Sequence, residues 1–230
     1  MLLTVAGSSC SGKTTAVRAC AAIAGLVVHD FDEIGVPSGA DTSWRQRSME
    51  AWVRRVLRYQ AGGLDVVLTG QSPLGEVLAC PSATRLDGIA ACLLDVDDAV
   101  RLRRLDDRRR YDGDAKRRFL GWARWHRGHA ADPRHQPEAL TSGGWTPMRW
   151  DRWQDWTSDD PRWNVCVIDT TGRNVEQSAV DITRWIADAR ADLASGRLGL
   201  TGAWAVSVSR PGASARTPGS VQPVTDGPSH

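Results

Sequence analysis

The stretch that decides the fold is LLTVAGSSCSGKTT, residues 2–15, close to the start of the sequence. Gly7, Gly12, Lys13 and Thr14 form the pattern G-x-x-x-x-G-K-T between an apolar run that predicts a buried strand and a segment that predicts a helix. In that context successive backbone N–H groups can surround a phosphate, and the positive end of the helix faces the anion. The glycines permit backbone angles that a side chain forbids. Residues 7–14, here called the glycine loop, are therefore predicted to bind phosphate.

Lysine usage supports a specific role for Lys13. The chain has 29 lysine and arginine residues, and only Lys13 and Lys116 are lysines. In so arginine-rich a sequence, a lysine stands where a compact ammonium is required and a planar guanidinium fits badly. We expect Lys13 to reach the β- and γ-phosphates and the Thr14 hydroxyl to bind Mg²⁺. The residues expected to hold the nucleotide around the loop are Gly7, Ser9, Cys10, Ser11, Gly12, Lys13, Thr14 and Thr15.

Length and composition bound the class of protein. The chain has 230 residues, 41% of them hydrophobic, and a formal net charge of +2, which suits one domain and does not by itself favour nucleic acid as a partner. Five cysteines without a C-x-x-C pair indicate free thiols in a reducing cytosol. No apolar run approaches the ~20 residues that span a bilayer, and the amino terminus does not resemble a signal peptide. We expect a cytoplasmic protein with no membrane partner, whose oligomeric state the sequence does not reveal.

Further apolar runs predict four more strands separated by helices. The strands are expected over residues 26–29, 64–69, 89–96 and 165–169, and the helices over 44–60, 97–110, 114–129 and 175–193. This alternation predicts right-handed crossovers and a five-stranded parallel sheet covered on both faces, which is an α/β three-layer sandwich. Because ligands bind such sheets at the carboxyl ends of the strands, the glycine loop, the carboxylates after His29 and the turn after Asp169 should share one rim.

The predicted domain covers residues 1–195 and includes a helical lid at about 97–163. From Gly196 onward Gly, Ser, Pro, Thr and Ala dominate, so the tail over 196–230 is expected to be disordered because it buries too little apolar area. Local docking of Leu198, Leu200 and Trp204 is the alternative. The tryptophans at 145–163 are expected to form a satellite core, with stacking on a ligand as the alternative. His126, His129 and His135 have a poor spacing for a metal and are expected to be exposed or to cap helices.

Taken together, the motifs resemble the small P-loop kinases, such as shikimate, gluconate, nucleoside and nucleotide kinases and chloramphenicol phosphotransferase. A guanine-reading N-K-x-D is absent, as is an apolar strand that ends in Asp-Glu, so the chain does not resemble GTPases or large motor and transporter ATPases. The resemblance covers roughly residues 1–193 and is most specific at the glycine loop. It implies ATP and Mg²⁺ as cofactors and transfer of the γ-phosphate to a hydroxyl of a small-molecule acceptor, for example a sugar, a nucleoside or an antibiotic-like compound.

The carboxylates after the second predicted strand carry the catalytic part of the resemblance. In shikimate kinase a D-x-D follows this strand, one carboxylate holding Mg²⁺ through water and the other gripping the substrate hydroxyl; Asp30-Phe31-Asp32 matches that spacing. In the chloramphenicol enzyme a single aspartate there is the proposed base, and Asp30 fits it best. The resemblance thus implies Asp30 as base and, with Thr14, as metal ligand, ahead of Asp32 and Glu33. A carboxylate there can orient a hydroxyl and accept its proton, although one of them can instead cap the next turn.

Arginines after the fourth predicted strand match the lid of these kinases. In the segment 97–110, Arg101, Arg104 and Arg108 share one helical face, and the resemblance implies that Arg104 and Arg108 contact phosphate during transfer. Six aspartates over residues 97–114 dilute the positive field that nucleic acid requires. The turn 170–172 resembles the one that packs on adenine, which makes Thr171 a nucleotide-binding candidate. The acceptor is expected between the helix 44–60 and the lid, with three arginine candidates: Arg45, Arg47 and Arg54.

One departure from the family is Thr69-Gly70-Gln71, where many relatives have Asp-Gly and the aspartate contacts water on Mg²⁺. The missing aspartate has three explanations: Asp30 or Asp32 replaces it in the metal shell, the enzyme is slow, or the loop only binds nucleotide. The neighbouring Gln71 can form a hydrogen bond to the acceptor. Two alternatives therefore remain beside the small-molecule kinase. One is a kinase of nucleotides or of polynucleotide 5′-hydroxyls, and the other is a nucleotide-binding regulatory ATPase.

Overall fold

The computed structural model describes residues 1–109, 111–202 and 204–205. Within these residues, five strands form one parallel sheet in the order β2-β3-β1-β4-β5. The strands are β1 (Leu2–Ala6), β2 (Leu26–Asp30), β3 (Asp65–Thr69), β4 (Ile89–Asp95) and β5 (Val165–Asp169). The predicted five-stranded parallel sheet is confirmed, and β1, which leads into the glycine loop, lies at its centre.

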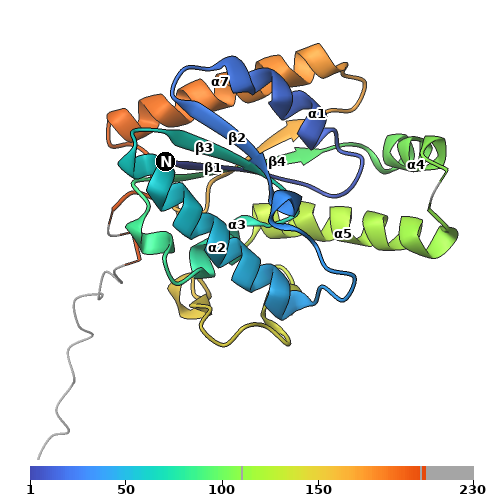
Figure 1. Ribbon diagram of the computed structural model, residues 1–230. Coiled ribbons are helices and arrows are strands. Elements are labelled where there is room, and N and C mark those ends of the chain that lie inside the picture. Colours follow the sequence, from blue (N-terminus) through green and yellow to red (C-terminus); the bar gives the residue numbers. More distant parts are fainter. Residues whose placement is uncertain (110, 203, 206–230) are drawn as a thin grey trace, which may run out of the picture.

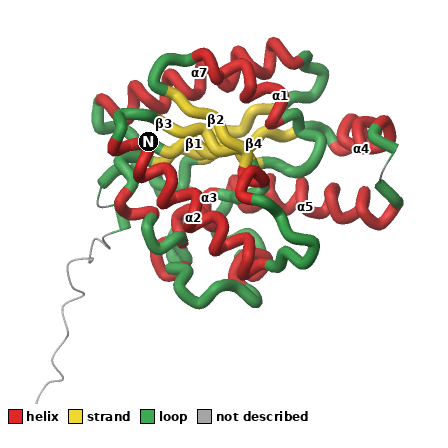
Figure 2. The backbone as a smooth tube through the Cα atoms, in the orientation of Figure 1, coloured by secondary structure: helices red, strands yellow, loops and turns green. Residues whose placement is uncertain are grey.

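Helices cover both faces of the sheet, as Figures 1 and 2 show. They are α1 (Lys13–Arg18), α2 (Thr42–Ala61), α3 (Leu74–Ala79), α4 (Asp98–Asp107), α5 (Gly113–Ala131), α6 (Glu138–Thr141) and α7 (Val175–Ala194). Short 3₁₀ helices occupy Ala19–Ala22, Phe31–Ile34, Ala83–Arg85 and Trp150–Arg152. Helices α1 and α7 pack on one face, and α2, α3 and α5 on the other (Figure 1). This arrangement is the three-layer sandwich expected from the alternation of strands and helices.

Successive side chains of β1 enter the two different cores. Leu2 packs among residues of α2 and α3, whereas Leu3 packs among residues of α1 and α7. Both faces of a central parallel strand are buried, which is why β1 reads as a continuous apolar run and not as an alternating one. The first core also takes in Trp153, Trp156 and Trp163, which are buried. The expectation that the tryptophan-rich segment forms core is therefore confirmed, but these side chains join one of the two main cores and do not form a separate satellite.

Helix α2 is bounded by residues whose chemistry sets its ends. The Asp41 carboxylate accepts a hydrogen bond from the Trp44 N–H over 2.6 Å, which satisfies a donor of the first turn. At the other end Gly63 has a φ of 74°, a conformation that an L side chain rarely adopts. These signals place the start of α2 beside the carboxyl ends of β2 and β3.

The chain remains packed beyond the boundary expected at residue 195. Leu200 and Trp204 are buried, and the Ile89 N–H donates to the Leu200 carbonyl over 3.0 Å. Arg162 donates to the Trp204 carbonyl over 3.1 Å. The expectation of disorder from 196 onward is therefore wrong for residues 196–202 and 204–205, where a few apolar side chains suffice to dock the segment. The rest of the expected tail, from 206 onward, lies outside the described residues.

No helix in the described part of the chain combines the length and the apolar character needed to cross a bilayer.

Candidate active site

A cleft of about 820 Å³ opens where the glycine loop, the ends of β2 and β3, the start of α2 and the lid meet. It brings together most of the residues that the sequence singles out for binding and catalysis. These are Ser9, Cys10, Gly12, Lys13, Thr14, Thr15, Asp30, Asp32 and Arg108. The glycine loop and the carboxylates after His29 therefore lie at one edge of the sheet, as predicted, whereas the turn after Asp169 does not line this cleft.

The glycine loop depends on glycine at two positions. Gly7 has a φ of 150°, and a Cβ there would lie 2.3 Å from the Leu94 carbonyl oxygen, so the loop passes too close to β4 for any side chain. Gly12 has a φ of 94° just before α1 begins. Cys10 adopts a φ of 64°, which is uncommon for a residue with a side chain. The loop therefore contains backbone conformations with positive φ, which are unfavourable for most residues and do not occur in regular helices or strands.

Three carbonyl groups of the loop are bound by side chains from elsewhere in the fold. Arg101 Nη1 donates to Ser9 O (2.5 Å), Arg104 Nη1 to Cys10 O (3.1 Å), and Thr170 Oγ1 to Ser11 O (3.1 Å). Since a trans peptide holds its N–H opposite its C=O, fixing the carbonyls also fixes the directions of the N–H groups. These contacts keep the loop in one conformation, as a preorganised anion site requires.

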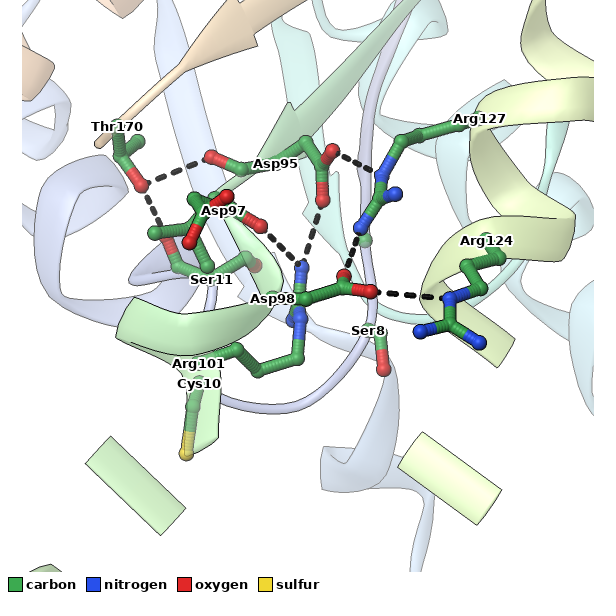
Figure 3. Close-up of polar contacts among 12 residues, drawn as sticks. Ser8, Cys10, Ser11, Asp95, Asp97, Asp98, Arg101, Arg124, Arg127 and Thr170 are labelled. Carbon is green, nitrogen blue, oxygen red and sulfur yellow. Dashed lines mark hydrogen bonds and ion pairs between the residues drawn. The ribbon is translucent and has the colours of Figure 1, made fainter. Parts of the chain in front are cut away.

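Arg101 is the buried end of an ionic network that runs outward to exposed side chains of α5, shown in Figure 3. Its side chain is 0% exposed, and Nη2 lies 2.6 Å from Asp95 Oδ1 at the end of β4. Arg127 of α5 binds the other oxygen of Asp95 at 2.6 Å and also pairs with Asp98, which in turn pairs with Arg124. Helical spacing predicts that Arg101 shares a face with Arg104 and Arg108, the two arginines expected to contact phosphate. In the structure it is a buried group that holds the loop.

Lys13 extends back over the loop. Its Nζ donates to Gly7 O over 2.7 Å and to Ser8 O over 3.4 Å. Burial lowers the pKa of Lys13 to about 8, with the charge of Asp30 acting in the opposite direction. The ammonium is therefore charged at neutral pH and begins to lose its proton in mildly alkaline solution.

Asp30 joins the loop to the sheet. Its Oδ2 accepts hydrogen bonds from Thr14 Oγ1 and from Thr69 Oγ1, each over 3.0 Å. Thr14 and Asp30 thus present two oxygens side by side in the cleft. Mg²⁺ in phosphoryl-transfer sites takes one or two protein oxygens and fills its other positions with phosphate oxygens and water, so this pair fits the ion. Among the described residues no group of three His, Cys, Asp or Glu side chains can hold a metal on its own.

The 3₁₀ helix Phe31–Ile34 shows that Asp30 both caps a turn and faces the cleft. Its Oδ1 accepts from the Asp32 N–H (3.1 Å), and Glu33 Oε1 accepts from the Asp30 N–H (2.8 Å) in a capping box. Asp32 lines the cleft, and desolvation together with the charge of Asp30 raises its pKa. Glu33, the third carboxylate candidate, does not line this cleft and pairs with His29 at 2.7 Å.

The arginines expected at the acceptor are divided by the structure. Arg45 lines the cleft and pairs with the fully buried Glu76 at 2.9 Å. Arg47 bonds Ser43 and Arg54 pairs with Glu50, and neither lines the cleft. The three arginines point to different sides of α2, so only Arg45 of the three candidates lies at the cleft. Arg118, which sequence reasoning did not select, does line the cleft.

The remaining lid candidates have separate positions. Arg104 reaches the Cys10 carbonyl and Arg108 lines the cleft, so both lie next to the glycine loop. Thr171 does not line the cleft, and its hydroxyl accepts from the Asp97 N–H over 2.8 Å. Its contact with adenine stays a prediction. Thr170, its neighbour, has the more direct link to the loop through Ser11.

His126 and His129 are buried, so the expectation of exposed or capping histidines is wrong for both. His129 stacks on Trp125 with ring centroids 4.7 Å apart, and His126 packs edge-on against Trp122 at 5.0 Å. Burial lowers the pKa of His129 to about 4 and that of His126 well below its usual value. Both rings therefore belong to the aromatic packing of α5 as neutral groups. The spacing of four residues between Trp122 and His126 and between Trp125 and His129 is the sequence signal for this packing.

Comparison with solved structures identifies similar folds at low sequence identity. A sugar kinase from a Janibacter species is 17% identical, with a TM-score of 0.53, over 83% of this chain and 96% of that chain. Thymidylate kinase from Candida albicans is 10% identical, with a TM-score of 0.46, over 82% and 92% of the two chains. An uncharacterized protein from Eubacterium ventriosum is also 10% identical, with a TM-score of 0.45, over 81% and 98%. No protein-family profile and no curated protein matches the sequence.

The likeness to the sugar kinase extends over nearly all of both chains, and it concerns the fold alone. Together with the sheet order, it shows that this chain shares an α/β fold with that kinase.

Proposed function

We propose that the protein is an ATP- and Mg²⁺-dependent kinase that transfers the γ-phosphate to a hydroxyl group of a small molecule. One observation carries the proposal. Thr14 of the glycine loop and Asp30 at the end of β2 lie 3.0 Å apart in a cleft that also holds Lys13 and Asp32. Phosphoryl transfer needs a phosphate cradle, a place for Mg²⁺ and a carboxylate beside the acceptor, with little covalent work by the protein.

The glycine loop and Lys13 would bind the triphosphate, and Thr14 with Asp30 would hold the metal. Bound Mg²⁺ supplies positive charge that neutralises the β- and γ-phosphate oxygens. Arg108, which lines the cleft, and Arg104, which reaches the loop, would stabilise charge that develops during transfer. Charged donors aimed at developing charge contribute about 3 kcal/mol each when well placed.

The carboxylates would divide the work between them. All the hydrogen bonds described for the Asp30 carboxylate come from Thr14, Thr69 and the Asp32 N–H, so both of its oxygens already have protein partners. Asp32 lines the same cleft, and no hydrogen bond to its carboxylate occurs among the described residues. We therefore infer that Asp30 serves the metal and Asp32 receives the acceptor proton, which reverses the order favoured by the sequence.

The test begins with binding. Calorimetry with a non-hydrolysable ATP analogue and Mg²⁺ should show association with the wild-type protein, and ³¹P NMR should show ATP-dependent phosphorylation within a pool of hydroxylated metabolites. Lys13→Ala should lower turnover more than a hundredfold while circular dichroism and the unfolding midpoint stay close to wild type. A protein that binds no purine triphosphate in the presence of Mg²⁺ contradicts the proposal.

The regulatory ATPase alternative makes a different prediction, namely tight ATP binding with no phosphorylated product. Its support in the sequence was the threonine at position 69, where relatives have aspartate. In the structure Thr69 is hydrogen bonded to Asp30, so a carboxylate is present at this place. This contact favours the kinase. We also infer a cytoplasmic location, because all five cysteines are free thiols.

A further inference from the structure

We propose that the acceptor is an uncharged alcohol that carries a flat, unsaturated ring, and that aromatic side chains at the acceptor end of the cleft bind this ring. The inference rests on the proposed function, because it names the class of compound that receives the phosphate. The acceptor end is defined here as the part of the cleft lined by Phe31, Trp44, Arg45, Phe119 and Trp122.

Four aromatic side chains form the walls of the acceptor end. Phe31 comes from the 3₁₀ helix that follows β2 and Trp44 from the first turn of α2, and their rings meet edge to face at 6.1 Å. Phe119 and Trp122 come from α5 and share one helical face because they are three residues apart. The chain contains two phenylalanines, and both line this cleft. Phe31 is largely buried in the first core, whereas Trp44, Phe119 and Trp122 are half-buried and offer most of the aromatic surface to the cleft.

The aromatic walls are held rigidly by their neighbours. Trp122 stacks on Trp125 with centroids 4.5 Å apart and an angle of 6° between the rings. On the other wall, Trp52 Nε1 donates to the Phe31 carbonyl over 3.0 Å. A ligand therefore meets surfaces that need little ordering, which favours binding of a flat partner. Aromatic faces held in this way stack on any ring that presents a π surface.

Phe31 also links the aromatic walls to the reacting groups. It lies between Asp30 and Asp32 in the sequence, and all three residues line the cleft. An acceptor whose ring contacts Phe31 therefore has its attached hydroxyl next to the carboxylates. The ring would determine the position of the compound and the hydroxyl would enter the chemistry.

The charges at the acceptor end disfavour an anionic acceptor. Arg45 is already paired with the buried carboxylate of Glu76 at 2.9 Å, and its guanidinium lies over Trp122 at 5.7 Å. Asp32 and Asp41 also line the cleft and would repel a phosphate ester. Arg118 lines the cleft from the lid, where it is exposed. Two unpaired, buried arginines would be needed to clamp a phosphomonoester. No such pair occurs among the described residues that line the acceptor end.

The experiment compares compounds in matched sets of three. One set is uridine (neutral, flat ring), uridine 5′-monophosphate (same ring, anionic) and ribose (hydroxyls, no flat ring). A second set replaces the nucleoside by 2-phenylethanol, its phosphate ester and 2-cyclohexylethanol, which tells a base from an aryl ring as the source of stacking. Binding is measured by saturation-transfer NMR with Mg²⁺ and a non-hydrolysable ATP analogue present, and phosphate transfer by ³¹P NMR with ATP. The neutral ring compound of at least one set should bind about tenfold more tightly than both partners.

Two leucine variants test whether the aromatic wall provides this preference. Trp122→Leu should weaken binding of the neutral ring compound about tenfold or more and leave the affinity for the ATP analogue within twofold. Trp122→Phe keeps an aromatic ring at this position and should recover most of the lost affinity for the ring compound. Trp185→Leu is the matched control, since Trp185 is a half-buried tryptophan on another long helix and does not line the cleft. It should leave ring binding unchanged.

The outcomes separate this inference from the proposed function. If the protein binds the ATP analogue but prefers the phosphate esters or the ringless compounds, the inference is wrong and the kinase proposal stands. Failure of every neutral ring compound to bind the nucleotide-loaded protein also overturns the inference. Failure to bind the ATP analogue at all contradicts the proposed function itself.

Discussion

Asp30 and Thr69 are register partners in neighbouring strands, and Thr69 Oγ1 donates a hydrogen bond to Asp30 Oδ2 over 3.0 Å. The contact places a carboxylate of β2 beside the end of β3, where related kinases were expected to have their own aspartate. It also leaves Oδ2 of Asp30 in contact with Thr14 of the glycine loop. A threonine at the end of β3 is therefore compatible with a metal site formed from β2.

Substituting the two aspartates in turn should separate their roles. Asp30→Asn should raise the Mg²⁺ concentration needed for half-maximal activity about tenfold or more, because a neutral amide is a weaker ligand for a hard cation. Asp32→Asn should lower kcat about a hundredfold with little change in the Mg²⁺ requirement, because it removes only the proton acceptor. Steady-state kinetics over a Mg²⁺ titration measure both effects. The reverse pattern would assign the base to Asp30.

Binding of a triphosphate should change the protonation of Lys13. With a pKa of about 8 in the free protein, Lys13 is partly deprotonated at pH 8.5 and protonated at pH 6.5. The negative charge of bound phosphates raises the pKa again, so binding at pH 8.5 should take up roughly half a proton or more, and binding at pH 6.5 should take up none at this group.

Calorimetry of the ATP analogue in buffers of different ionisation enthalpy measures this uptake. Lys13→Arg is the matched control, since a guanidinium does not titrate in this range and should show no uptake at pH 8.5. An unchanged uptake in Lys13→Arg would mean that another group takes the proton.

Removing the Arg101 side chain should destabilise the fold strongly. The substitution Arg101→Ala leaves Asp95 with only Arg127 as its ionic partner and frees the Ser9 carbonyl, so we expect a loss of about 3 kcal/mol in the free energy of unfolding. Arg103 lies on the same helix but is exposed, and Arg103→Ala should change the stability by less than about 0.5 kcal/mol. Urea denaturation measures the two variants. Equal stabilities would show that the buried network contributes nothing.

Two glycine-to-alanine variants should shift stability in opposite directions. Gly7→Ala introduces a Cβ 2.3 Å from the Leu94 carbonyl oxygen at a φ of 150°, and should cost about 2–3 kcal/mol. Gly121→Ala adds a methyl group to the exposed side of α5 with no atom within 4 Å, and should stabilise the protein by about 0.5–1 kcal/mol because alanine favours helix. Thermal unfolding of both proteins gives the comparison. A stable Gly7→Ala protein would contradict the observed packing of the loop against β4.

The features that the sequence predicted well are local. The G-x-x-x-x-G-K-T pattern, the five apolar strands and the carboxylates after His29 each lie within a few consecutive residues. The rules of parallel sheets then place them at one edge. The sequence leaves open whether Asp30 caps the next turn or faces the cleft. Both are possible together, because Oδ1 accepts the hydrogen bond of the cap and Oδ2 accepts one from Thr14 in the cleft.

The features that were missed depend on contacts between distant segments. Helical spacing grouped Arg101 with Arg104 and Arg108, but only the position of Asp95 explains why Arg101 is buried. The aromatic end of the cleft combines Phe31 with Trp122, from elements that are far apart in the chain. Docking of Trp204, which the sequence offers only as an alternative to disorder, depends on its contact with the distant Trp156. Packing over long distances, and not local propensity, decides these cases.

Lys13 already has a partner in the Gly7 carbonyl. An incoming anion must therefore replace this carbonyl as the hydrogen-bond partner of the ammonium. The net gain in free energy is only the difference between an ionic hydrogen bond and a hydrogen bond to a neutral oxygen. We expect strongly basic, multiply charged oxygens to win this exchange and weakly basic anions not to displace the carbonyl. The contact between Lys13 and Gly7 is therefore expected to make the glycine loop selective among anions.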